Sequence, residues 1–442
     1  MSANFSKPGW LRLALAVVAC VVGGAFALAP THAQSPGSPP PQCAAQGTGL
    51  SLCAQVGEKL FFDTNLSASR QMACASCHDP NSHYAQSNTT PVQSGGPTLK
   101  TPGFRAVPSL TYKELTPAYS DDAANPDGIS TNAPGGGYTW DGRANTLAAQ
   151  ATIPLLSSFE MANANAAAVV TTVENSSYAQ LFMTAWGVNV FSDPATAFTD
   201  IGLSLQAYQL EDPDFHPYTS KYDYFATIAL SNGKPVQLTA AELRGFNVAL
   251  NPNGGNCFAC HFNGQMVGGG GAVFTDFTFQ AIGVPRNTNI PANVTRPGLP
   301  PTYYDLGLCT AENPAFPHTL PASAQYCGMF KTPTLRNTAT RNVFFHNGVF
   351  NNLTDVINWY NTRDTNPSAW YPTVKGVVQK FNDLPTVYRS NLDDVDVPFD
   401  GLPLGGEPHM TSQDVADLKC FLQTLTDGYV QGVTAQDPNC IN

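Results

Sequence analysis

Two stretches of this sequence decide how its fold is organised: Cys74-Ala75-Ser76-Cys77-His78 and Cys257-Phe258-Ala259-Cys260-His261. In each stretch, a pair of cysteines is followed directly by a histidine. Two thiols at this spacing can add to both vinyl groups of one porphyrin, and the adjacent histidine then reaches the iron. A zinc site would need four donors, and neither stretch has a second Cys or His pair at finger spacing. We therefore expect two covalently bound c-type haems.

An apolar helical pattern precedes each motif: Leu52, Val56 and Leu60 before the first, and Leu243, Phe246 and Leu250 before the second. The second pattern opens with a capping box from Thr239 to Glu242. This repetition, about 180 residues apart, indicates an internal duplication with one domain per haem.

Further helices are predicted where Ile201, Leu205 and Tyr208 share a face, and where Val415, Leu418, Leu422 and Leu425 follow Thr411 as a cap. Strand-like alternation is scarce, and Gly and Pro are frequent in the connections. The expected fold is mainly α, with two cytochrome c-like domains and long irregular loops. The predicted order is a signal peptide (1–33), a Pro-rich leader (34–50), an N-terminal domain (51–235) and a C-terminal domain (236–442).

The N-terminus has the pattern of a secretory signal. Lys7 and Arg12 come before an apolar stretch from Leu13 to Leu28, and Thr31-His32-Ala33 supplies small residues for cleavage. Cys20 loosely resembles a lipoprotein site, but the apolar stretch continues past it, so lipid anchoring is less favoured. No later segment resembles a transmembrane helix, and the net charge of -11 argues against nucleic acid as a partner.

The cysteine count also favours export. The chain has 11 cysteines, and six remain once Cys20 and the four of the haem motifs are set aside. These six fall into local couples, which are Cys43 with Cys53, Cys309 with Cys327, and Cys420 with Cys440. An even number closing short loops is typical of an oxidising compartment, although only proximity along the chain favours these pairs.

Several more motifs follow one another in the chain: Gly57 to Asp63 before Leu66-Ser67, Cys74 to Pro80, Trp140-Asp141-Gly142-Arg143, Gln150 to Met161, Cys257 to His261, and Phe330 to Asn337 leading to Phe345-His346-Asn347-Gly348. With them, nearly all of the mature chain resembles the bacterial di-haem cytochrome c peroxidases and their MauG-type relatives. The resemblance implies a periplasmic oxidoreductase that reacts with hydrogen peroxide and takes electrons from a protein donor.

The resemblance assigns the peroxide reaction to the N-terminal haem, bound by Cys74, Cys77 and His78. The family's distal pocket has a Gln, a Pro and a Glu at a spacing that Gln150, Pro154 and Glu160 reproduce. A carboxylate above an open iron position can move a proton from one peroxide oxygen to the other. The plainer interpretation of Glu160 is a surface carboxylate.

Trp140 matches the family's tryptophan between the two haems, which passes electrons from one to the other. The plainer interpretation of Trp140 is an ordinary core residue. A core tryptophan can also pass electrons, so the two interpretations are compatible.

At two places the sequence differs from the conventional peroxidases of the family, and both differences favour the MauG-type branch. The loop from Gln93 to Pro108 contains no histidine, so we expect the N-terminal haem to be open. Tyr360 stands where conventional members have a methionine and MauG-type members a tyrosine, which implies that the C-terminal haem is bound by Cys257, Cys260, His261 and Tyr360. Met329 and Met410 remain rival ligands, and a core tyrosine is the plainer interpretation of Tyr360.

A third departure concerns calcium, which the family often holds between the haems. Its asparagine ligand is replaced by Ala106, and Arg341 begins the segment that usually carries a Thr-x-Pro. We expect calcium to be absent or weakly bound, with the Arg341 guanidinium in its place. A surface cation is the alternative interpretation.

The leading hypothesis is therefore a periplasmic MauG-type enzyme that uses hydrogen peroxide to oxidise a protein or other electron donor through high-valent haem. The alternatives are a cytochrome c peroxidase that takes electrons from a small cytochrome c, and a di-haem electron carrier without peroxidase activity. Two insertions, Asp121 to Gly137 and Val284 to Ala324, are candidates for a docking surface, although most loops of this composition have no such role.

Overall fold

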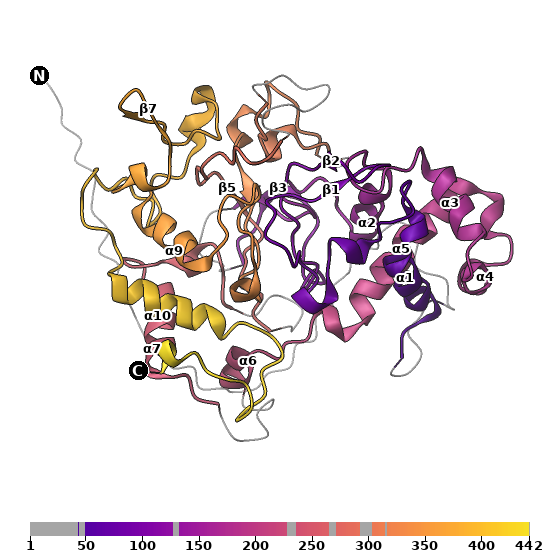
Figure 1. The fold of residues 1–442 in the computed structure, drawn as a ribbon, viewed down its shortest axis with the longest axis horizontal. Coiled ribbons are helices and arrows are strands. Elements are labelled where there is room, and N and C mark those ends of the chain that lie inside the picture. The colour runs from indigo at the N-terminus through magenta and orange to yellow at the C-terminus, as the bar shows by residue number, and fades with distance from the viewer. Residues whose placement is uncertain are drawn as a thin grey trace, which may run out of the picture. The chain divides into compact units, whose positions relative to one another are not determined.

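Short helices joined by long loops make up most of the computed structural model (Figure 1). The structure describes residues 43, 49–126, 132–227, 236–264, 271–291, 303–313 and 316–441. The predicted signal peptide (1–33), most of the leader (34–50) and the chain just before the predicted domain boundary at 235 lie outside these ranges. The boundary therefore stays a prediction.

The α-helices of the described residues are α1 Leu52–Phe62, α2 Leu147–Leu156, α3 Ala166–Glu174, α4 Ala179–Trp186, α5 Pro194–Glu211, α6 Lys221–Ala226, α7 Ala240–Leu250, α9 Leu353–Thr362 and α10 Ser412–Gln423. The strands are β1 Ser94–Gly95, β2 Thr101–Pro102, β3 Ser120–Ala123, β4 Ala133–Gly135, β5 Phe279–Gln280, β6 Phe330–Lys331, β7 Thr373–Val374 and β8 Val377–Val378. They form antiparallel, two-stranded sheets in which β1 pairs with β2, β3 with β4, β5 with β6, and β7 with β8. The predicted mainly α fold is confirmed.

The predicted helix starts are also confirmed. Thr239 and Glu242 form a reciprocal capping box at the start of α7, and Thr411 forms another with Asp414 at the start of α10. A side-chain oxygen at this position accepts a hydrogen bond from a backbone N–H that has no partner inside the helix. The Ser51 hydroxyl does the same for α1, accepting from the N–H of Ala54.

One hydrophobic core surrounds the first cysteine motif and is built from α1 to α5, which lie together at the right of Figure 1. Helix α1 packs closely on α5 at Gly57. A Cβ at Gly57 would come within 2.0 Å of the Ser204 carbonyl oxygen, so only glycine permits this approach.

A second core surrounds the other motif and joins α7, α9 and α10. Here α7 crosses α10 at Gly245, where a Cβ would lie 1.9 Å from the Asp417 carbonyl oxygen. The buried face of α7 therefore contains Ala241, Gly245 and Ala249. Two residues of the apolar pattern, Leu243 and Leu250, are exposed instead, because small side chains are needed where the two backbones come close.

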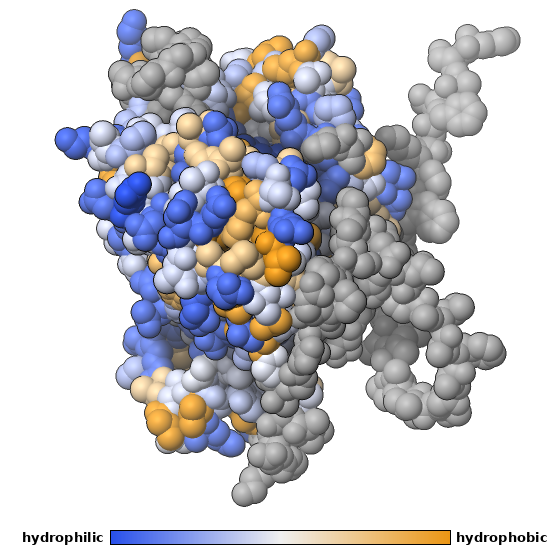
Figure 2. Space-filling model, turned by 90° about the vertical axis from the view of Figure 1, so that its right-hand side faces the viewer, coloured by the Kyte–Doolittle hydropathy of each residue, from blue (hydrophilic) through white to orange (hydrophobic). Residues whose placement is uncertain are grey.

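All three cysteine couples form disulfides, which are Cys43–Cys53, Cys309–Cys327 and Cys420–Cys440. None of the helices in the described ranges has the length and apolarity needed to cross a membrane. Figure 2 shows the side of the molecule that carries α3 and α4, where the described surface is mostly hydrophilic and hydrophobic residues gather in a few separate areas.

Candidate functional site

The first cysteine motif forms a single tight turn. Cys74 to Ser76 make a 3-10 helix, and the His78 N–H donates to the Cys74 carbonyl at 2.9 Å. The Cys74 and Cys77 thiols form no disulfide. The turn therefore presents two thiols and an imidazole from one short stretch, as covalent haem attachment requires.

The His78 ring is oriented by a backbone acceptor. Its Nδ1 lies 3.0 Å from the Tyr84 carbonyl oxygen, so Nδ1 carries the proton and Nε2 keeps its lone pair. Burial lowers the pKa of His78 to about 4, which keeps the ring neutral at neutral pH. A neutral imidazole with a free Nε2 is the form that binds a metal.

The predicted distal residues lie in the same cavity as His78. Gln150 and Pro154 belong to α2, and Glu160 follows in the turn after that helix; all three line the cavity with His78. Burial raises the pKa of Glu160, and the Ser157 hydroxyl and the charge of Arg143 moderate this rise.

The turn that carries Glu160 is held against the β1–β2 hairpin. The Gly96 N–H donates to the Glu160 carbonyl at 2.8 Å. A Cβ at Gly95 would come within 2.6 Å of that oxygen and 2.9 Å of the Glu160 Cα. The glycine therefore lets the hairpin pack directly on this turn.

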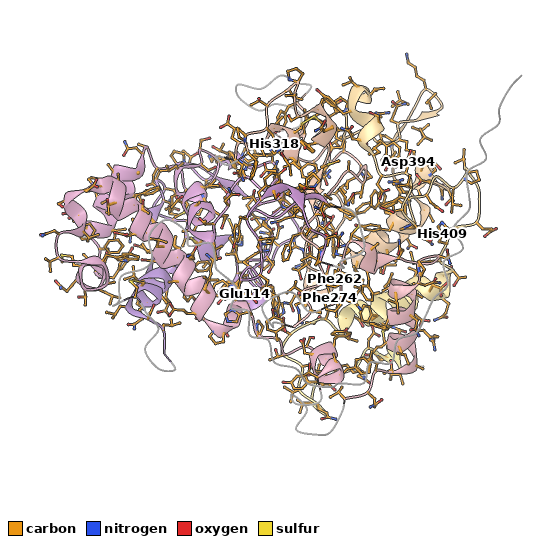
Figure 3. The ribbon with its side chains drawn as sticks, turned by 180° about the vertical axis from the view of Figure 1, so that it is seen from behind. Glu114, Phe262, Phe274, His318, Asp394 and His409 are labelled. Carbon is orange, nitrogen blue, oxygen red and sulfur yellow. A yellow bond between two sulfur atoms is a disulfide. The ribbon has the colours of Figure 1, made fainter. Side chains whose placement is uncertain are left out.

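The second motif repeats the geometry of the first. The His261 N–H donates to the Cys257 carbonyl at 2.8 Å, and Cys257 and Cys260 are free thiols. The His261 Nδ1 lies 3.2 Å from the carbonyl oxygen of Phe274, which Figure 3 labels, and 3.1 Å from that of Pro333. Burial lowers the pKa of His261 to about 4, so this imidazole is neutral too.

Tyr360 lines the second cavity together with His261. It projects from α9 beside Leu353, Val356 and Ile357, which line the same cavity. Burial raises the pKa of Tyr360, so the phenol is neutral unless a cation stabilises its anion. A ferric iron is such a cation.

Of the two rival methionines, Met410 lines the second cavity and remains a candidate ligand. Met329 packs instead with the cluster around Tyr119, Phe279 and Leu308. Among the described residues that line this cavity, Met410 is the only methionine.

Trp140 lines both cavities, as do Lys331 and Pro333. Its indole N–H donates to the Ala106 carbonyl at 2.9 Å, and its own carbonyl accepts from the Lys331 N–H at 2.9 Å. These two bonds hold the indole where an aromatic side chain can connect the cavities.

A network of charges holds the loop that follows Trp140. Asp141 bonds Arg105 at 2.8 Å and Arg143 at 2.6 Å, and Arg105 also bonds Asp305 at 2.6 Å. The two arginines hold the pKa of Asp141 well below its usual range. The local sequence around Arg105 and Asp305 gives no indication of an ion pair between residues so distant along the chain.

The cavity linings fit haem in a second respect, because they contain buried imidazole and ammonium groups that can donate to a carboxylate. His346 is 6% exposed, and its ring stacks on Phe330 at 3.6 Å in the second cavity. Its Nε2 has no hydrogen-bond partner and lies 3.7 Å from the Asp383 carboxylate. Lys113 and Lys331 line the first cavity, and burial lowers their pKa values to about 8 and about 7. The Lys331 ammonium also donates to the Gly137 carbonyl. The carboxylates of haem propionates are suitable partners for such groups. Lys331 and His346 belong to motifs noted in the sequence, whereas nothing there indicated Lys113.

Arg341 lies where the two halves of the chain meet. Its guanidinium donates to the Val107 carbonyl at 3.0 Å and to the Val343 carbonyl at 3.2 Å. It thus bonds two backbone oxygens, the type of ligand that calcium also uses.

The chain is similar to several known proteins. Residues 52–229 match the family model described as di-haem cytochrome c peroxidase. The methylamine utilization protein MauG of Paracoccus denitrificans is 33% identical over 70% of this chain and 74% of its own length. The cytochrome c551 peroxidase of Pseudomonas aeruginosa is 25% identical over 69% of this chain and 70% of its own.

Among solved structures, the diheme peroxidase BthA of Burkholderia thailandensis is 36% identical, with a TM-score of 0.74. The match covers 85% of this chain and 86% of that one.

Proposed function

Because the chain belongs to the di-haem cytochrome c peroxidase family, and is therefore a peroxidase with two c-type haems, we propose that it is a MauG-type enzyme. Its reductant would be an amino-acid side chain of a partner protein. The observation that carries the proposal is Tyr360 in the cavity of the second haem.

Cys74, Cys77 and His78 would hold the first haem, whose iron would supply the chemistry that reduces hydrogen peroxide to two waters with two electrons and two protons. Among the described residues that line this cavity, His78 is the only histidine. The described lining thus offers no second imidazole that could compete with peroxide for the iron.

Glu160 handles the protons in this proposal. Its carboxylate accepts a proton from one peroxide oxygen and delivers it to the other, which leaves as water. The raised pKa suits this task, because a group that both accepts and donates a proton works best when its pKa is near the working pH. The side-chain amide of Gln150 donates a hydrogen bond in the same cavity.

Trp140 connects this cavity to the second one. Its backbone and indole are both hydrogen-bonded, so the ring keeps its orientation while electrons pass. Cys257, Cys260 and His261 would hold the second haem, and Tyr360, which lines the same cavity, would be a further ligand to its iron. An anionic phenolate ligand lowers the potential of an iron and stabilises its oxidised states.

A cytochrome c peroxidase that draws electrons from a small cytochrome c is the second candidate. Met410 favours it, because this thioether lines the second cavity and a methionine ligand raises the haem potential. The relative from Pseudomonas aeruginosa is named a cytochrome c551 peroxidase.

A peroxide titration decides between the two. One equivalent of hydrogen peroxide is added to the oxidised holoenzyme without prior reduction, and visible and near-infrared spectra are followed. The MauG-type proposal expects an immediate Soret change and a long-lived near-infrared band. Reactivity that appears only after half-reduction with a small cytochrome c supports the second candidate.

The Tyr360→Phe variant makes the titration specific. Without the phenolic oxygen, the spectrum of the C-terminal haem changes and the near-infrared band is lost, while the N-terminal haem keeps its spectrum. Met410→Leu is the matched control and leaves both haem spectra as they are. An unaltered C-terminal haem in Tyr360→Phe contradicts the proposal.

We further propose that the enzyme works in the periplasm. The signal pattern within residues 1–33 and the three disulfides support export to an oxidising compartment. Cell fractionation with N-terminal sequencing of the mature chain tests this, and a cytoplasmic chain with an intact N-terminus contradicts it.

A further inference from the structure

Three polar side chains form a closed triangle outside both haem cavities. The Tyr119 hydroxyl donates to the Asp121 carboxylate and lies 3.2 Å from the His318 Nε2. The same Nε2 lies 2.9 Å from the Asp121 Oδ1. Tyr119 and His318 are only 3% and 5% exposed, whereas the Asp121 side chain is 41% exposed. The triangle thus links a buried phenol to the surface through one carboxylate.

The triangle joins the two insertions noted in the sequence. Asp121 begins one of them, in β3, and His318 belongs to the other. The disulfide Cys309–Cys327 closes the loop that carries His318, and the His318 N–H donates to the Ala311 carbonyl at 3.1 Å. Figure 3 labels His318 at the upper edge of the molecule, away from Glu114 and His409.

Aromatic rings surround the phenol. Tyr119 makes edge contacts with Phe316 at 5.8 Å and with His318 at 5.3 Å between ring centroids, and Tyr326 lies 5.1 Å beyond the His318 ring. Phe316 is 41% exposed. An external partner can therefore approach the phenol through one ring as well as through Asp121.

A short route leads from Tyr119 to the Trp140 loop. Tyr119 contacts Phe279 at 5.8 Å, Phe279 pairs with Lys331 across β5 and β6, and the Lys331 N–H donates to the Trp140 carbonyl. A Cβ at Gly142 would meet the Phe279 ring at 2.8 Å and the Tyr119 ring at 3.1 Å. Both rings therefore pack directly against the loop that carries Trp140.

A phenol gives up an electron readily only when its proton has somewhere to go. Burial and the Asp121 carboxylate raise the pKa of Tyr119, so it does not lose its proton alone. Once an electron is removed, the same hydrogen bond carries the proton to Asp121. The buried phenol thereby stays neutral, which avoids the cost of a charge in an apolar site.

We propose that Tyr119, with Asp121 as its proton acceptor and His318 holding that carboxylate, is a redox-active site. It passes oxidising equivalents from the haems to an amino-acid side chain of a partner protein docked at this surface, which is the electron donor. The inference rests on the proposed function for its oxidant, the haem pair after peroxide has taken two electrons. One electron leaves Tyr119 for that pair, and the phenolic proton moves to the Asp121 Oδ1. An electron from the docked donor and the returning proton then restore the phenol.

The test uses the holoenzyme and radical spectroscopy. One equivalent of hydrogen peroxide is added, samples are frozen within milliseconds, and electron paramagnetic resonance detects tyrosyl radical while the Soret band reports the haems. The native enzyme shows a tyrosyl signal that Tyr119→Phe lacks. Tyr178→Phe is the matched control, since its hydroxyl donates to Asp63 at 2.7 Å, and it keeps the signal.

Asp121→Asn separates a redox role from a purely structural one. The amide still forms hydrogen bonds but does not accept the proton, so radical formation slows by about a hundredfold, the range for loss of a general base. A tyrosyl signal that persists in Tyr119→Phe, or equal rates in Asp121→Asn and the native enzyme, overturns the proposal.

A second oxidant separates this inference from the proposed function. A photogenerated ruthenium(III) complex oxidises the protein without peroxide, and the tyrosyl signal again depends on Tyr119. If peroxide leaves the Soret band unchanged, the proposed function fails and the photochemical result decides on Tyr119 by itself. Equal photochemical signals in the native enzyme and Tyr119→Phe exclude it.

Discussion

Glu160 illustrates how much the surroundings of one side chain determine its chemistry. A glutamate ten residues after Gln150 is an ordinary feature of a sequence, and a solvated one would have an ordinary pKa. In the fold it lines the cavity of His78, and burial raises its pKa. Its role as the proton carrier stays a prediction that mutation can test.

We expect Glu160→Gln to slow the reaction of the holoenzyme with hydrogen peroxide by about 10²- to 10³-fold, because the amide cannot relay a proton. Stopped-flow measurement of the Soret change gives this rate. Glu174→Gln, on an exposed turn of α3, is the control and keeps the native rate.

The proposed role of Glu160 also implies a pH dependence for the rate of the peroxide reaction. The reaction needs Glu160 in its basic form, and the pKa is raised, so the native rate falls as the pH drops through a value above that of an ordinary glutamate. In Glu160→Gln this fall of the rate at low pH is absent. A profile that is identical in both excludes Glu160 as the base.

At the scale of elements, the core around each cysteine motif contains one close contact between two helices. Gly57 brings α1 onto α5, and Gly245 brings α7 onto α10. Both glycines lie in the helix that precedes a cysteine motif, so the two crossings belong to the same internal repeat. The apolar pattern predicted both helices, but it pointed to Leu243 and Leu250 as buried, because helical spacing does not reveal which face meets another backbone.

Gly245→Ala tests this crossing. Alanine favours a helix by about 1 kcal/mol over glycine. However, its Cβ would meet the Asp417 carbonyl oxygen at 1.9 Å, and backbone cannot move aside as a flexible side chain does. We expect overpacking to dominate, with a net loss of about 1–3 kcal/mol in the free energy of unfolding.

Denaturant unfolding of the holoenzyme measures this loss. Gly49→Ala serves as the control, since no atom lies within 4 Å of a Cβ there. A Gly245→Ala variant as stable as the native enzyme would show that the two helices do not approach as closely as described.

At the scale of the whole molecule, Arg341 connects segments from both halves of the chain. Its bonds reach Val107, after the first haem motif, and Val343, after the second. Burial lowers the pKa of Arg341 to about 10, so the guanidinium remains charged at neutral pH. A fixed cation in this place would make a bound calcium redundant and electrostatically unfavourable.

We therefore expect less than stoichiometric calcium in the purified holoenzyme and no change in its melting temperature on adding a chelator. Elemental mass spectrometry and thermal unfolding measure the two quantities. Arg341→Gln removes the charge, so this variant should be less stable and should bind calcium more tightly than the native enzyme. One firmly held calcium per native chain would refute the idea.

The sequence by itself determined the features that depend on neighbouring residues. The spacing of Cys74, Cys77 and His78 already predicts a haem site, because these groups share one turn. Capping residues such as Thr239 and Thr411 predict where helices begin, since their partners lie within the same turn. The three disulfides followed from short separations along the chain.

Only the tertiary structure decided which distant side chains come together. It brought Asp305 to Arg105, placed Trp140 in the lining of both cavities, and joined His318 to Tyr119. These pairings depend on how helices and long loops pack, and packing has no local signal in the sequence. The motifs therefore predicted two haems. The residues around each haem cavity, and the contacts that join Trp140 to Tyr119, depend on the tertiary fold.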